Sequence, residues 1–110
     1  MTGCMAHARR RFDESVTVLK KDFTKEQLKE TTAYQAMARI GMFYKSEEMI
    51  RDKSPEERYE ERQKQANPIL EAFFEWLHTM EEAVDRSSKI REAVLYTLNQ
   101  ETYLKRYLED

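Results

Sequence analysis

Three residues in one predicted helical stretch have the spacing of a metal site. Glu75 and His78 follow the Glu-x-x-His pattern of carboxylate-bridged dimetal proteins, and Glu71 lies one turn earlier on the same face. Such a site needs a second Glu-x-x-His on a facing helix, but the other histidine, His7, has no Glu three residues before it. We therefore interpret Glu71, Glu75 and His78 as a solvated helix face and expect no metal or other cofactor in this chain.

The single cysteine also stands at a ligand-like spacing, in Cys4-x-x-His7. Two ligands do not make a zinc site, and the sequence offers no second pair. A nucleophilic Cys-His pair would need a base within reach and an oxyanion hole, neither of which the sequence suggests. We therefore favour a structural or incidental role for both residues. A lone cysteine forms no disulfide framework, so a reducing compartment is expected.

The one basic cluster, Arg9-Arg10-Arg11, is followed three turns later by Lys20 and Lys21. Consecutive Arg residues on a helix spread over about 200° and could straddle a DNA backbone through phosphate contacts. A solvated, salt-bridged helix face explains the same charges, and the sequence alone favours that interpretation. Because the formal net charge is -2, electrostatics alone do not indicate nucleic acid binding. DNA binding by these five residues is therefore a hypothesis.

The elements that must position these side chains are expected to be helices. The 110 residues include 2 Gly and 2 Pro, and 36% are charged, which favours long helices over sheets with many turns. The length fits a single domain, 1–110. We predict an all-α fold, a small antiparallel bundle of four to five helices. The most apolar stretch, 66–84, predicts its core helix, with an apolar stripe of Ile69, Phe73, Trp76, Met80 and Val84 widened by Leu70, Phe74 and Leu77.

Periodicity and capping signals predict the other helices. Residues 5–21 carry apolar residues at helical spacing, and Thr24 opens a second helix that is expected to run to about Arg51. Ser54 followed by Pro55 and two Glu opens a third. Ser88 can cap a last helix that ends near Leu108. The sequence therefore provides enough helices to enclose one core.

Three single residues carry more local predictions. Gly41 lies inside the second predicted helix and is expected to mark a close helix crossing. Tyr59 is nearly the only apolar anchor in the polar stretch 55–66, which should be solvated. Pro68 favours a kink over a break between this stretch and the core helix.

No apolar stretch indicates a secretory signal or a membrane span. The first residues, MTGCMAHARRR, lack the apolar region of a signal peptide, and no run approaches the ~20 apolar residues of a transmembrane helix. A cytoplasmic protein without a membrane partner is expected. No Gly-rich phosphate loop and no supported Ser/His/Asp pattern is present, so no small-molecule substrate is expected either.

Several ordered blocks together resemble the insertion-sequence-66 family of bacterial transposases. The first block, Gly3-Cys4-Met5-Ala6-His7-Ala8-Arg9-Arg10-Arg11-Phe12, matches the family's Gly-Cys-Trp-Ala-His-Ala-Arg-Arg-Lys-Phe segment closely. The resemblance covers nearly the whole chain, and the order of its blocks makes it more specific than any single motif. The further matching blocks are Ser54-Pro55-Glu56-Glu57-Arg58 with Arg62, Pro68-Ile69-Leu70 through Trp76-Leu77, Ser88-Lys89-Ile90 with Ala93, Tyr96, Leu98, Asn99 and Gln100, and Tyr107-Leu108-Glu109-Asp110.

The resemblance implies a non-catalytic part of a larger enzyme. The family's ribonuclease-H-like core holds a divalent metal such as magnesium with an Asp, Asp, Glu set, and none of the three matches a position in this chain. The matching segment resembles the family's helical insertion between the last core strand and the helix that bears the Glu. This chain departs from the family pattern at Met5 and Glu101, where the family usually has Trp.

Two functions of different classes follow from the sequence. The first is a fragment of a DNA transposase that supports the positioning of DNA or subunits and catalyses nothing alone. The second is a free-standing helical interaction module that forms a homodimer through uncovered apolar surface. DNA affinity that depends on Arg9 to Arg11 would support the first, and concentration-dependent dimerisation without DNA binding would support the second.

Overall fold

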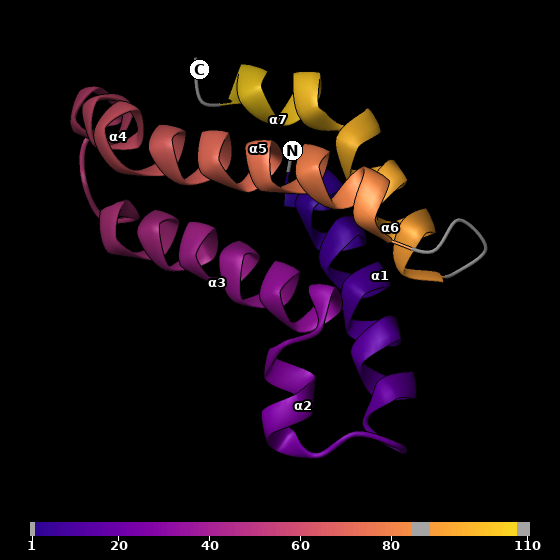
Figure 1. Cartoon of the computed structure of the whole chain (residues 1–110). Coiled ribbons are helices and arrows are strands. Elements are labelled where there is room, and N and C mark those ends of the chain that lie inside the picture. The colour runs from indigo at the N-terminus through magenta and orange to yellow at the C-terminus, as the bar shows by residue number, and fades with distance from the viewer. Residues whose placement is uncertain (1, 85–88, 108–110) are drawn as a thin grey trace.

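The computed structural model describes the backbone of residues 2–84 and 89–107 and the side chains of residues 5–84 and 89–106. All the regular structure in these ranges is helical, which confirms the predicted all-α fold (Figure 1). The elements are α1 (Thr2–Leu19), α2 (Lys25–Lys29), α3 (Thr32–Ile50), α4 (Pro55–Glu61), a π-helical segment η1 (Arg62–Ala66), α5 (Asn67–Ala83), α6 (Lys89–Asn99) and α7 (Glu101–Tyr107).

Four of these helices form a closed ring around the core. α3 packs against α1 and α5, and α6 packs against the same two helices from the other side. Figure 1 shows α3 and α5 running antiparallel, with α1 crossing them steeply. The molecule measures 46 × 25 × 20 Å, and its radius of gyration of 14.7 Å exceeds the ~13 Å typical of this length. α2 and the end of α1 extend away from the ring (Figure 1), which accounts for the elongated shape.

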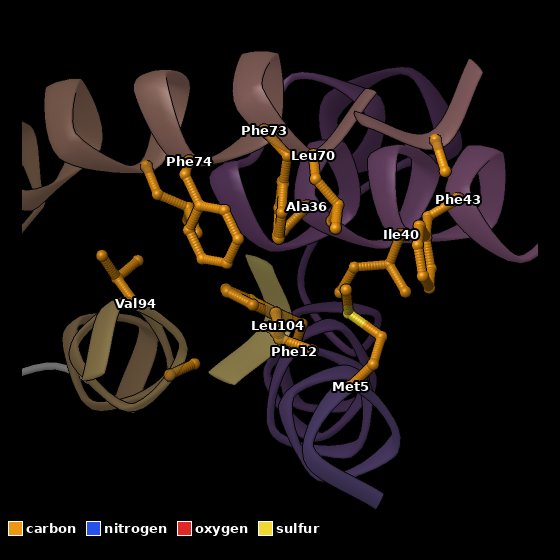
Figure 2. Packing of buried hydrophobic residues seen from close by; sticks show 13 residues of the cluster. Met5, Phe12, Ala36, Ile40, Phe43, Leu70, Phe73, Phe74, Val94 and Leu104 are labelled. Atoms are coloured by element: carbon orange, nitrogen blue, oxygen red, sulfur yellow. The ribbon is translucent and has the colours of Figure 1, made fainter. Parts of the chain in front are cut away.

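The core is built on phenylalanines from three helices of the ring. Phe12, Phe43, Phe73 and Phe74 are all almost completely buried, and Figure 2 shows them converging with side chains from α1, α3, α5, α6 and α7. Met5, which stands where the transposase family usually has Trp, is also fully buried in this cluster. The apolar side predicted for the first helix therefore faces the core at Met5 and Phe12, which confirms this part of the prediction.

The buried face of α5 is rotated relative to the predicted stripe. Its most buried residues are Leu70, Phe73, Phe74 and Leu77, whereas Trp76 at the predicted centre is half-buried. The reason is that α3 and α6 both pack on α5, so the buried arc faces the space between them. The Arg39 guanidinium lies over the Trp76 ring, 4.7 Å from the ring centroid.

The long helix predicted from Thr24 to Arg51 is wrong, because the structure divides it into α2 and α3. The capping box of Thr24 with Gln27 is present as predicted. Thr31 then takes an extended conformation, and its side chain accepts a hydrogen bond from the Tyr34 N–H, so a new helix begins.

The predicted last helix is also divided. Its start at Ser88 and its end at Leu108 lie outside the described residues. Between them α6 ends at Asn99, and the Gln100 N–H donates to the Thr97 carbonyl in a turn. The turn brings α7 against α5 and α6, where Leu104 is fully buried. Burial of this one side chain favours the break over a continuous helix.

The region from α4 to α5 follows the predicted helical path. Ser54 caps α4 through the Glu57 N–H, as predicted. The kink predicted at Pro68 takes the form of η1, in which the Asn67 N–H donates to the Arg62 carbonyl five residues earlier. The stretch 55–65 is exposed or half-buried throughout, which confirms that it is solvated, and Tyr59 itself is 45% exposed.

Gly41 lies in an uninterrupted helix, and no other described element crosses α3 there. A Cβ atom at this position would meet nothing within 4 Å. The predicted crossing within the chain is therefore wrong. Nothing in the chain's own packing requires a glycine at this position, where Gly costs about 1 kcal/mol relative to Ala.

Candidate nucleic-acid interface

The arginine cluster lies on the outward side of α1. Met5, Ala8 and Phe12 face the core, so the intervening residues must cross the solvent side of the helix. Arg9, Arg10 and Arg11 are all exposed, and we call these three residues the α1 ridge.

Two tyrosines hold the outer arginines of the α1 ridge in opposite directions. The Arg9 guanidinium lies 5.6 Å from the ring centroid of Tyr44, on α3. The Arg11 guanidinium lies 4.2 Å from that of Tyr96, on α6. Arg10 stands between them. The predicted spread of three consecutive Arg residues is therefore present, and ring contacts restrict two of the three side chains.

A shallow groove runs along each side of the α1 ridge. The groove toward α3 has a volume of about 300 Å³ and is lined by Arg9, Arg10 and Tyr44 among others. The groove toward α6 has a volume of about 230 Å³, and Arg11 and Lys89 line it. Each side thus presents cationic groups to a ligand that follows the ridge.

Acidic side chains limit the positive potential of this surface. Asp13 lines the first groove, and Glu14 and Glu92 line the second. The site therefore resembles a set of discrete guanidinium contacts more than a broad basic patch. Burial raises the pKa of the Tyr44 phenol above its ordinary value although Arg9 acts in the opposite direction, so this ring stays neutral at physiological pH.

The two predicted lysines are not part of this surface. Lys20 and Lys21 lie in the turn that follows α1, exposed, and line neither groove. At 1.5 Å per residue they stand about 15 Å along the helix from Arg10. The structure therefore brings together three of the five predicted cations and separates the other two. Lys89, which the sequence did not single out as a cation, joins the arginines because α6 packs on α1.

The Glu71, Glu75 and His78 face is exposed, which confirms the predicted solvated face. His78 Nε2 lies 2.9 Å from Glu101 Oε1, and Lys105 Nζ lies 2.8 Å from Glu101 Oε2. Partial burial raises the pKa of Glu101, but hydrogen bonds and charges from Lys105 and His78 outweigh it and hold the pKa below its ordinary value. His7 is exposed, and the Cys4 side chain lies outside the described residues.

Comparisons with known proteins identify the family. The family model described as "Transposase IS66 family" matches residues 1–110. The chain belongs to the IS66 transposase family. Two relatives from Sinorhizobium fredii are uncharacterised proteins: y4hP is 29% identical over 110 residues, and y4jD is 30% identical over 107 residues. The matches cover 97% of this chain but 20% and 19% of the relatives, so the chain spans about a fifth of their length.

No solved structure matches this IS66-family chain. None of the helices in the described ranges is long and apolar enough to cross a membrane. The described side chains also bring together no group of three or more His, Cys, Asp or Glu that could hold a metal ion.

Proposed function

We propose that this chain is a helical, non-catalytic part of a DNA transposase that positions DNA through the α1 ridge. Membership of the transposase family over residues 1–110 supports a role in transposition. The single observation that carries the DNA-positioning role is the arrangement of Arg9, Arg10 and Arg11 over two flanking grooves. Phosphate contacts of this kind position a protein on DNA without reading its sequence.

The ring contacts of Arg9 and Arg11 support this role. An arginine that stacks on a tyrosine keeps its planar face occupied and its N–H edge free for an anion. Because the ring already restricts the side chain, less rotamer entropy is lost when a phosphate binds. Arg10 reaches into solvent between them and adds a third contact.

The proposal that this chain is non-catalytic rests on the family's sequence pattern. No residue of this chain matches the Asp, Asp, Glu set of the family. The purified chain should therefore leave DNA intact in the presence of magnesium. A metal-dependent cleavage product that persists in a nuclease-free preparation would contradict this part of the proposal without affecting the DNA-positioning role.

The experiment that tests DNA positioning compares two charge-matched triple variants. In the first, Arg9, Arg10 and Arg11 are each replaced by Gln, which keeps most of the aliphatic stem. In the second, Lys53, Lys64 and Arg106 are replaced by Gln; all three are exposed and lie outside both grooves. Both variants change the net charge equally, so a difference between them reports on the location of the contacts.

The readout is fluorescence anisotropy of a labelled duplex at several salt concentrations. We expect a non-specific dissociation constant between about 10⁻⁴ and 10⁻⁶ M. Loss of three phosphate contacts should reduce the slope of log K against log [salt] by about 2 to 3 in the ridge variant, with little change in the control. Equal weakening by both variants, or no binding by the unmodified chain, would contradict the proposal.

A homodimeric interaction module is the alternative function. It is favoured by apolar side chains that α3 leaves exposed, including Met42 at 57% and Met49 at 64% exposure. These residues line neither groove of the α1 ridge, so the two functions use different surfaces.

A further inference from the structure

The outward side of α3 carries an apolar face that no described element covers. Tyr34, Met42 and Met49 are 37%, 57% and 64% exposed. Ala38, Gly41 and Lys45 are exposed between them. At 100° per residue these six positions fall on one side of the helix, opposite the buried residues such as Ile40 and Phe43. We call these six residues the α3 face.

Gly41 lies at the middle of the α3 face, in a helix interior that gains nothing from a glycine. Its missing side chain leaves open space, since a Cβ would meet nothing within 4 Å. A second helix packed on this side would fill that space, because small residues allow two helices to approach closely. Ala38, one turn before Gly41, also has a small side chain, so a second helix could approach closely there too.

The α3 face is self-complementary when a second copy packs antiparallel on it. The six residues are spaced symmetrically on either side of the peptide bond between Gly41 and Met42. Many helix faces have such symmetric spacing. The side-chain sizes at the facing positions are what favour pairing. Each large side chain meets a small or matching one: Met42 faces Gly41, Lys45 faces Ala38, and Met49 faces Tyr34 of the second copy.

In this antiparallel arrangement each facing pair would make a favourable contact, as follows. The Met42 side chain fills the space above the partner glycine, and the Met49 sulfur packs against a tyrosine ring. The Lys45 stem lies across the partner alanine while its ammonium group stays in water. A two-fold axis makes every contact twice, as in most symmetric dimers.

We propose that the α3 face is the interface of a symmetric homodimer in which two α3 helices pack antiparallel, centred on Gly41 and Met42. The inference rests on the interaction role and is independent of DNA contact, because the α3 face shares no residue with the α1 ridge or its grooves. A single helix pair is smaller than the ~1,600 Å² of a standard interface, so a weak dimer that forms only at high protein concentration is expected.

The first test replaces Gly41 with Gln and measures two quantities that should move in opposite directions. Sedimentation velocity over a concentration series should show that the dissociation constant of the dimer rises at least tenfold. Thermal unfolding, measured well below the dissociation constant, should show a more stable monomer, because Gln is a better helix former and the position has room for it. A more stable monomer excludes misfolding as the cause of the lost dimer.

A matched control replaces Tyr103 with Gln. This tyrosine is 62% exposed, close to the 64% of Met49, but lies on α7. Dimerisation should be unchanged in Tyr103→Gln and weakened in Met49→Gln. A chain that stays monomeric at all concentrations, or a dimer that Gly41→Gln leaves intact, overturns the proposal. The DNA titration of Gly41→Gln should match that of the unmodified chain, so the two proposals fail separately.

The second test fixes the direction and register of the helices by cross-linking. In a Cys4→Ser background, Met42→Cys places a thiol beside the two-fold axis, and a short thiol cross-linker should join the two copies. Met49→Cys places the two thiols about 22 Å apart along the helix axis, at 1.5 Å per residue, and should not be cross-linked. Mixed Tyr34→Cys and Met49→Cys chains should be joined. Cross-linking of Met49→Cys with itself would indicate another arrangement and overturn the proposal.

Discussion

The aromatic centre and the polar connection of this molecule are held by different interactions. The aromatic centre, formed by Phe12, Phe43, Phe73 and Phe74, is closed to solvent. The polar connection, α4 with η1, buries Ala66 alone among its described residues. It is tied to α3 by Arg62, whose Nε lies 3.1 Å from the Glu47 carboxylate. Apolar packing dominates the first region, whereas the second combines the buried Ala66 with a specific ion pair.

These two regions differ in how far their positions can be predicted from the sequence. Periodic apolar residues predict which side of a helix is buried without knowledge of its partner. The polar stretch of α4 and η1 has no such pattern, and its ion pair to α3 joins Arg62 to a residue 15 positions earlier in the chain. Variants of the two regions should therefore differ in both size and kind of effect.

The largest effect is expected in the aromatic centre. Phe73→Ala removes a ring that lies 5.4 Å from Phe74 and 6.3 Å from Trp76 between centroids. The lost transfer energy and the remaining cavity should lower the free energy of unfolding by about 4 kcal/mol, measured by urea denaturation. Phe73→Leu is the control and should cost less than half as much. A loss below about 1 kcal/mol for the alanine variant would show that this centre does not hold the ring of helices together.

An intermediate effect is expected in the polar connection. Both side chains of the Arg62–Glu47 pair are 17% exposed, so Arg62→Met leaves a largely buried carboxylate without its main partner. We expect a loss of about 2 kcal/mol. In a double-mutant cycle, Glu47→Gln should cost less in the Arg62→Met background than alone. Strictly additive losses would show that the pair does not fix α4 and η1.

The smallest effect is expected for a more exposed ion pair, which sharpens the contrast between the two regions. Glu101 pairs with Lys105 and His78, whose side chains are 46% and 57% exposed. Because the folded pKa of Glu101 is depressed, its contribution is present above the ordinary carboxyl pKa and is lost as pH falls through the folded value. Glu101→Gln should cost about 0.5 kcal/mol at pH 7 and less than that at pH 3.

The control for this pH dependence is Glu71→Gln on the exposed face of α5. Glu71 has no ion pair among the described residues, so its replacement should not change stability at either pH. Thermal unfolding at both pH values checks the two variants side by side. A Glu101→Gln loss that is as large at pH 3 as at pH 7 would contradict an electrostatic origin.

The sequence predicted those parts of the fold that local chemistry decides. The caps at Thr24 and Ser54 and the inward side of α1 required no knowledge of distant contacts. The break at Gln100 was missed because no residue there ends a helix on its own. Burial of Leu104 under α5 and α6 decides it, and that contact exists only in the folded chain.

In the candidate nucleic-acid interface, too, local spacing predicts some features and contacts between distant helices decide the others. The outward position of Arg9 to Arg11 follows from the spacing of Met5, Ala8 and Phe12. The contacts to Tyr44 and Tyr96 do not follow from spacing, because those rings come from helices far along the chain. The exposed α3 face was missed for a different reason. Gly41 predicted a helix crossing, and only the open space around it shows that the crossing is not made within this chain.

The most direct test of DNA binding by the α1 ridge is an NMR titration of the chain with a short DNA duplex at low salt. Amide shifts should concentrate on α1 near Arg9 to Arg11 and on the groove walls around Tyr44 and Lys89. The Arg9, Arg10, Arg11→Gln variant should lose them, and the α3 face should stay unchanged. Shifts confined to other surfaces, or no shifts at all, would contradict the proposal that this IS66-family chain positions DNA through the α1 ridge.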